Sequence, residues 1–223
     1  MEVAVMKEVA KKLPQYEFQF VPTSDDDLLI GVESGKYDIG TKGAWKTPAR
    51  EKKYIFPKNN IAASVIGVTI RKEDANTIKN LDDFAKAGKK LVPIAPQNAQ
   101  YQVIEDYNAA HPDHPVKLEA SENFQVADAY TWVLEGRYDG YFSIELAYKK
   151  NVEAPDAPYK DFKDKLSYFR YKAIPTYTVI NKNDKELAEQ VDKALGELKQ
   201  EGKIAELENK YFGEEVSKLI DVK

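Results

Sequence analysis

The chain has 223 residues, and 43% of them are hydrophobic, which is enough apolar material for two compact α/β lobes or one large domain. The formal net charge is −4 and charges of both signs are interleaved, which argues against a nucleic-acid-binding protein, since those carry clustered excess Lys and Arg. There is no cysteine, so disulfides, thiolate zinc sites and cysteine nucleophiles are excluded. The longest apolar run, Ile61 to Ile70, is too short to cross a bilayer.

Apolar spacing, alternation and capping signals predict the first elements in chain order: a helix over 2–13, a strand over 16–21, a helix over 25–34 and a short strand over 37–41. Pro14 ends the first helix. Ser24 and the acidic run Asp25–Asp27 are typical of a helix start, because negative charge suits the positive end of the helix dipole. Gly35 is typical of a left-handed residue at a helix end.

Strand and helix signals alternate through the rest of the chain. We expect strands over 65–70, 91–94, 116–119, 138–142 and 176–180. Helices are expected over 81–87, 98–109, 126–134, 184–199 and 204–211. Such alternation predicts a mostly parallel sheet with helices on both faces. The segment 151–164, which contains Pro155 and Pro158, is the most linker-like region.

A short motif that occurs twice, called the sequence echo below, suggests that one local structure is repeated. Gly35–Asp38 and Gly136–Asp139 share the pattern glycine, basic residue, tyrosine, aspartate, and each follows a predicted helix and opens a predicted strand. One interpretation is a chain of two α/β halves, with a ligand cleft where the carboxyl ends of their strands meet. The alternative is coincidence, because α/β proteins reuse this turn freely.

Three stretches, in an order that spans nearly the whole chain, carry a family resemblance. They are SGKYD at 34–38 followed by KTPAREKKYIF at 46–56, GRYDG at 136–140, and GKIAELENKYFG at 202–213. Together they resemble the family 3 extracellular solute-binding proteins, the receptors of polar amino-acid ABC importers. The surroundings of Trp45 are most similar to those of cystine-type receptors.

The resemblance implies an α/β fold of the two-lobed periplasmic-binding-protein type II, with two interlobe crossovers. Lobe 1 is expected to comprise 1–64 and 175–223, and lobe 2 to comprise 65–174. Family members begin with a strand and an aromatic loop that lines the ligand, so the first strand of lobe 1 is expected to be missing from this truncated chain. The sequence leaves open whether another chain or 217–223 supplies a strand, and whether the unpaired edge promotes self-association.

The resemblance places the ligand's α-carboxylate on Arg50, since a guanidinium presents two parallel donors to a carboxylate. From spacing alone, an exposed arginine in a charged run is the alternative. Thr47 is the expected companion, either as a carboxylate ligand or as the cap of a helix that starts at Pro48. Gly43 and Ala44 are interpreted as a loop at a strand end, which makes the next residue, Trp45, either an aromatic wall for the ligand or part of the core.

In the second lobe, Gln97, Asn98, Ala99 and Gln100 begin a helix just after a predicted strand. A helix start offers unpaired backbone N–H groups and positive potential to an anionic group, so these residues form a candidate ligand contact. Ordinary capping by Asn98 is the alternative, and one side chain can do both.

The ligand's ammonium group needs a carboxylate, which relatives supply as an aspartate shortly after the position of Asp139. The corresponding stretch here reads YFSIE at 141–145 and has no aspartate, although Ser143 and Glu145 are candidate contacts. Either Asp139 or Glu145 therefore substitutes, or the site is impaired. For Asp139, a structural role in the turn is the alternative.

The sequence thus predicts an extracytoplasmic receptor, in the periplasm or as a cell-surface lipoprotein, that captures a polar amino acid such as cystine for an ABC transporter permease. We expect its leader to lie outside this sequence, because Glu2 and Lys7 interrupt any apolar core at the N-terminus.

No cofactor, metal or nucleic acid is expected, and prolines restrict the convergence of His111 and His114 on a metal. Two alternatives to the receptor stay open. One is a dehydratase-like enzyme on the same fold, with Glu145 or Glu33 as the acid or base. The other is a degenerate receptor that acts as a sensor or interaction module.

Overall fold

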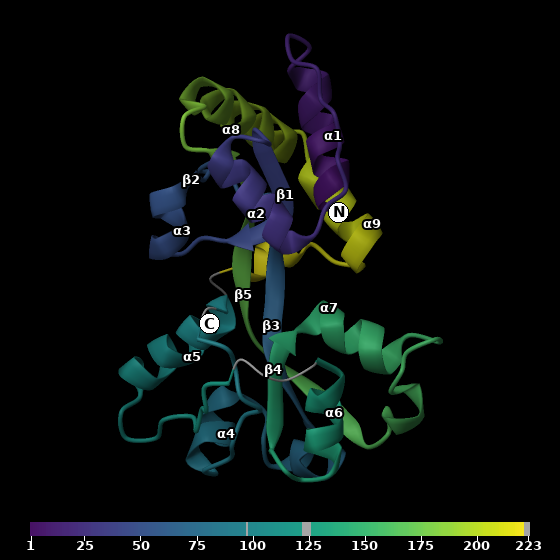
Figure 1. Cartoon of the computed structure of the whole chain (residues 1–223). Helices are drawn as coiled ribbons and strands as arrows, with labels where there is room; N and C mark the ends of the chain where they lie inside the picture. Colours follow the sequence, from purple (N-terminus) through teal and green to yellow (C-terminus); the bar gives the residue numbers. More distant parts are fainter. Residues whose placement is uncertain (97, 122–125, 221–223) are drawn as a thin grey trace. The chain divides into compact units, whose positions relative to one another are not determined.

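The structure is a computed structural model that describes residues 1–96, 98–121 and 126–220 (Figure 1). The chain divides into two compact units. Unit 1 consists of Met1–Ser64 and Ala173–Lys223, and unit 2 consists of Val65–Lys172. Among the described residues, no helix combines the length and the apolar composition that a membrane span requires.

Three helices of unit 1 pack on one another around an apolar core (Figure 1). They are α1 (Glu2–Lys12), α8 (Lys185–Gln200) and α9 (Lys203–Phe212). Each places apolar residues three or four positions apart on its inner face, as an amphipathic helix requires. Their largest buried side chains are Val5, Met6, Val9, Val191, Leu195, Leu198, Ile204 and Leu207.

The sheet of unit 1 is built on the C-terminal part of the long strand β5 (Leu166–Asn181). Two strands pair antiparallel with it: β1 (Ile39–Trp45) and β2 (Tyr54–Ile55). The helices on this side of unit 1 are α2 (Asp25–Ser34) and α3 (Pro48–Lys53), and the short 3-10 helix η4 (Val216–Leu219) follows α9. α2 packs on β1, where Val32, Ala44, Tyr54 and Val179 form a second buried cluster.

The predicted ends of α2 are confirmed in detail. The Ser24 hydroxyl accepts a hydrogen bond from the Asp27 N–H at its start, and Gly35 closes it in the left-handed conformation with φ 80°. Gly136, the second glycine of the sequence echo, has φ 74°. Both glycines therefore adopt a backbone conformation that other residues reach only with strain.

Unit 2 contains the antiparallel pair β3 (Ala62–Arg71) and β4 (Gly140–Ile144), in which Val68 lies opposite Phe142. Its α-helices are α4 (Leu81–Lys86), α5 (Ala99–Ala110), α6 (Val126–Leu134) and α7 (Glu145–Tyr148). Two short 3-10 helices, η1 (Lys72–Asn76) and η3 (Lys160–Phe162), and a π-helical turn, η2 (Lys149–Glu153), complete it. The core between these elements is rich in tyrosine and contains Tyr130, Tyr138, Tyr148 and Leu166.

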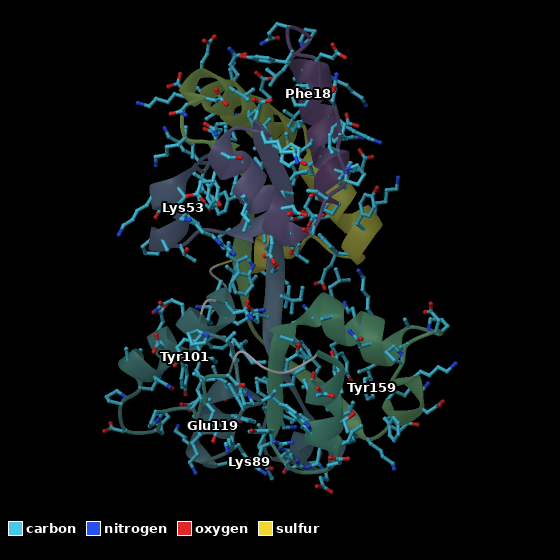
Figure 2. All side chains as sticks on the ribbon, viewed as in Figure 1. Phe18, Lys53, Lys89, Tyr101, Glu119 and Tyr159 are labelled. Carbon is cyan, nitrogen blue, oxygen red and sulfur yellow. The ribbon has the colours of Figure 1, made fainter. Side chains whose placement is uncertain are left out.

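Several predictions about local structure are wrong. The predicted strands over 91–94 and 116–119 contain only isolated bridge residues. Residues 16–21 form no strand and pair with no strand among the described residues; Phe18 (labelled in Figure 2) packs against the core of unit 1 instead, and Phe20 is 42% exposed. The segment 151–164 is not a linker, since its Val152 is fully buried in unit 2. The sheet is not mostly parallel: the β1–β5, β2–β5 and β3–β4 pairs are antiparallel, and the parallel pairs among the described residues include only isolated bridges such as Ile94 with Ala120.

Gly67 allows the backbone of β3 to lie close to the backbone of β5 at Phe169. A Cβ atom at this position would lie 2.0 Å from the carbonyl oxygen of Phe169 in β5, so no side chain fits without a shift of backbone. We expect Gly67→Ala to lower the free energy of unfolding by about 3 kcal/mol or more. Gly202→Ala, where φ is 74° and nothing lies within 4 Å, should cost only about 1 kcal/mol. Urea unfolding of both variants tests this, and equal losses would contradict it.

A buried carboxyl group holds the segment that follows α9. Glu208 is 1% exposed and accepts hydrogen bonds from the N–H and the hydroxyl of Ser217. Burial raises the pKa of Glu208, and these hydrogen bonds oppose the shift only in part. The folded state therefore holds this proton more tightly than the unfolded state, and stability is lost as the pH rises from 4.5, the ordinary value, through the folded pKa.

The neutral variant Glu208→Gln should escape this loss. We expect its melting temperature, measured relative to the unaltered chain, to rise between pH 4.5 and pH 7. Exposed Glu206→Gln is the matched control on the same helix, and it should not show this rise. Parallel pH profiles for Glu208→Gln and the unaltered chain would show that the buried carboxyl group is not responsible.

Candidate functional site

Arg50 is positioned by the short helix α3 and by the end of β1. Thr47 caps α3, since its hydroxyl oxygen accepts the Arg50 N–H at 3.3 Å, and Pro48 follows in the first turn, where its missing N–H costs nothing. The Arg50 side chain is partly buried and donates from Nη1 to the carbonyl oxygen of Trp45 at 2.9 Å. One end of the guanidinium is thereby anchored to the strand.

The guanidinium of Arg50 has no acidic partner among the described residues. Within the part of the chain that the structure describes, no carboxylate forms an ion pair with it, and its Nη2 has no acceptor. Burial lowers its pKa, and the charges of Tyr54 and Asp25 oppose this shift. Because an arginine stays charged in proteins, the result is a partly desolvated cation with unused donors, which favours an anionic ligand.

Gly43, Ala44 and Trp45 do not form the loop that the sequence suggested. They complete β1, where Ala44 lies opposite Tyr177 and Trp45 opposite Thr176, after a shift of register. Trp45 is only 8% exposed, so most of its side chain belongs to the core. Gly43 has φ 66°, and a Cβ there would lie 3.1 Å from a carboxylate oxygen of Glu2.

The candidate residues at the start of α5 lie in unit 2. Gln97 is outside the described residues. Asn98 is the exposed N-cap of α5, and no side-chain capping bond from it is seen, while Ala99 and Gln100 occupy the first turn. This turn contains no acidic residue, so its N–H groups keep their positive potential.

Asp139 is engaged by a network of cations in unit 2. Its carboxylate lies 3.0 Å from Arg71 and 3.4 Å from Lys89 (labelled in Figure 2), and it accepts the N–H of Lys90 at 2.9 Å. Burial alone would raise the pKa of Asp139, but the Lys90 N–H, Arg71 and Lys89 outweigh it, so the pKa is lowered. These contacts match the structural role in the turn.

Glu145 and Ser143 also have partners within unit 2. Glu145 forms a two-pronged ion pair with Arg170, at 2.9 Å and 2.8 Å, and Lys149 lies 3.5 Å away. Ser143 is buried, and its carbonyl oxygen accepts the hydroxyl of Tyr168. Neither acidic candidate of this unit therefore carries an unpaired carboxylate.

Comparison with known proteins gives a clear assignment. Residues 1–214 match the model of the bacterial extracellular solute-binding proteins, family 3. The chain belongs to this family. It is 28% identical to the L-cystine-binding protein TcyJ of Bacillus subtilis over 97% of this chain and 77% of that protein. The L-cystine-binding protein TcyA of the same organism is also 28% identical, over 97% of this chain and 74% of that protein.

Solved structures share the fold of this chain. A probable amino-acid ABC transporter extracellular-binding protein, ytmK of Bacillus subtilis, superposes with a TM-score of 0.76 at 24% identity and covers 95% of this chain and 87% of its own. An ancestral arginine-binding protein bound to arginine gives a TM-score of 0.66 at 24% identity, over 95% and 87% of the two chains. The curated relatives are binding proteins, so the family assignment supports binding and not catalysis.

Sequence reasoning missed two pairs of charged residues in this family member. Lys42 of β1 lies 2.8 Å from Asp25, the first residue of α2. Arg170 of β5 holds Glu145. The acidic run at Asp25 was interpreted only as a helix start, and no local signal connects either acid with its distant cation.

The histidines of the HPDHP loop make protein contacts only, as far as the structure describes the chain. His114 Nε2 lies 2.6 Å from Asp82, and His111 Nδ1 lies 2.9 Å from the carbonyl oxygen of Tyr107. No group of three metal-ligating side chains occurs among the described residues.

The two aspartates of the sequence echo should differ in their contribution to stability. Asp139→Asn weakens the bonds to Arg71 and Lys89, so we expect a loss of about 1–3 kcal/mol at pH 7. Because the folded pKa of Asp139 is lowered, this loss should shrink as the pH falls below 3.8, the ordinary value. Exposed Asp38→Asn is the matched control. Urea unfolding that finds equal, small losses for both variants would contradict the assignment.

Proposed function

We propose that this protein is an extracytoplasmic receptor that binds a polar amino acid and delivers it to the permease of an ABC importer. Membership of the solute-binding family supports the role in import. The observation that carries the proposal is Arg50: a partly buried guanidinium, anchored to the Trp45 carbonyl and without an acidic partner in the described residues. Every amino acid carries the α-carboxylate that such a group binds.

The chemistry of Arg50 suits a bidentate carboxylate contact. Its anchored Nη1 restricts the rotation of the plane before the ligand arrives, which reduces the entropy lost on binding. Partial burial strengthens a charge-assisted hydrogen bond, because the effective dielectric constant is lower than in water. A ligand carboxylate also supplies the counter-ion that Arg50 lacks.

Cystine is the finer proposal for the ligand. Three relatives from Bacillus subtilis are named L-cystine-binding proteins and are 27% to 28% identical to this chain. Similar structures include an ancestral protein bound to arginine and one bound to glutamine, so polar amino acids are the supported class and cystine is the first to test.

Several features stay proposals that rest on the family resemblance. They are the lobe bounds with two crossovers, the absent first strand with self-association through its open edge, the leader or lipid anchor, and contacts from Gln97, Asn98, Ala99, Gln100 and Ser143. Of the two acids proposed for the ammonium group, Asp139 and Glu145, each would have to leave an ion pair to take that role. We therefore place the weight of the proposal on Arg50.

Calorimetric titration with the proteinogenic amino acids and L-cystine tests this function. We expect at least one polar amino acid to bind the unaltered chain. Arg50→Met should weaken its affinity by about 30-fold or more, because the ligand carboxylate loses its charged partner, and Arg50→Lys should fall between the two. Lys52→Met removes an equal charge from an exposed position on α3 and should bind normally.

Each other result would reject a specific part of the proposal. If no amino acid binds, the chain is not an amino-acid receptor in this form, and the degenerate-receptor alternative is favoured. If Arg50→Met binds as tightly as Lys52→Met, the carboxylate site lies elsewhere. If the bound amino acid is converted during titration, the protein is an enzyme.

A further inference from the structure

Asp25 presents a half-engaged carboxylate at the start of α2. One of its oxygens, Oδ2, lies 2.8 Å from Lys42 Nζ, and no partner of Oδ1 is found among the described residues. The side chain of Asp25 is 75% exposed, whereas that of Lys42 is 18% exposed. Lys42 thus holds the acid from the protein side and leaves its second oxygen accessible.

This carboxylate belongs to the same part of unit 1 as the Arg50 site. Lys42 lies in β1, three residues before Trp45, whose carbonyl oxygen anchors Arg50. α2 packs on β1, and Asp25 opposes the lowering of the Arg50 pKa, although the two form no ion pair in the described residues. β1 therefore connects both charged groups, through the Lys42 ion pair and through the Trp45 carbonyl, within one unit.

Other acids fit an ammonium ligand less well. Asp139 and Glu145 are each bound by an arginine, which occupies a carboxylate more completely than one lysine does. Glu2 is a further acid close to β1, with its Oε1 3.1 Å from the place of a Cβ at Gly43. Of these four, Asp25 alone combines an accessible oxygen with an ion pair to β1, the strand whose last residue anchors Arg50.

We propose that Asp25, positioned by Lys42, accepts the α-ammonium group of the amino acid whose α-carboxylate binds Arg50. This inference rests on the proposed function and adds the group that distinguishes an α-amino acid from a plain carboxylic acid. The carboxylate and the ammonium of such a ligand are attached to one carbon atom, so they need acceptors of opposite charge in close proximity. Arg50 and Asp25 provide that pair from a single unit.

The test compares two forms of one ligand by calorimetry. The first is the amino acid of the panel that binds the unaltered chain most tightly. The second carries hydrogen in place of each α-amine, which for L-cystine is 3,3′-dithiodipropionate. The measured quantity is the dissociation constant of the deaminated form divided by that of the amino acid. A loss of folding alone would weaken both forms equally and leave this ratio unchanged.

Asp25→Asn should reduce this ratio by about tenfold or more, mainly through weaker binding of the amino acid. Asp26→Asn is the matched control, since it removes the same charge from the same helical turn, is exposed and has no ion pair in the described residues. It should keep the ratio of the unaltered chain. Lys42→Gln should lower the ratio by a smaller factor, because the Asp25 carboxylate is still present but loses the ion pair that positions it.

The outcomes separate this inference from the proposed function. If the unaltered chain binds an amino acid through Arg50 and Asp25→Asn keeps the full ratio, the inference is wrong and the proposed function stands. A collapse of the ratio in Glu2→Gln instead of Asp25→Asn assigns the ammonium to Glu2 and overturns it. If no amino acid binds the unaltered chain, both fall together.

Discussion

The partly buried guanidinium of Arg50 is the constraint on which the interpretation of this protein depends. A cation that has left part of its hydration shell needs compensation, and the Trp45 carbonyl supplies it at only one nitrogen. In most proteins an acidic side chain would complete the pair. Within the described part of this chain none does, and our proposal gives that place to the ligand carboxylate.

The local design of unit 1 explains why Arg50 is held in this way. Thr47 and Pro48 start the short helix α3 soon after the end of β1. Arg50 lies in the first turn of α3, and its side chain reaches back to Trp45, the last residue of β1. Tyr54 continues into β2 and donates its hydroxyl to the Leu29 carbonyl, which ties this segment to α2. Lys53 (labelled in Figure 2) adds an exposed ion pair with Glu33. The strand end thus holds the Arg50 side chain, and the contacts with α2 hold the segment that carries it.

Local signals predicted much of this arrangement, and distant pairings were missed. Ser24 and Gly35 act through their own backbone neighbours, so the limits of α2 could be predicted from a few residues. A strand instead requires a partner far away in the sequence. This is why the alternation at 16–21 gave a wrong prediction, and why β5 begins at Leu166, well before the predicted start at residue 176. The ion pair of Glu145 with Arg170 spans 25 positions, and its residues carry no shared pattern.

The charges near Arg50 also show why incomplete pairing suits a receptor. A direct ion pair between Asp25 and Arg50 would neutralise both groups, and a ligand would then have to break it before binding. Lys42 engages Asp25 instead, so the acid has a partner without occupying the guanidinium. A zwitterion can then join the two opposite charges at little cost in lost contacts. The same argument disfavours Asp139 and Glu145, because each would have to give up an arginine.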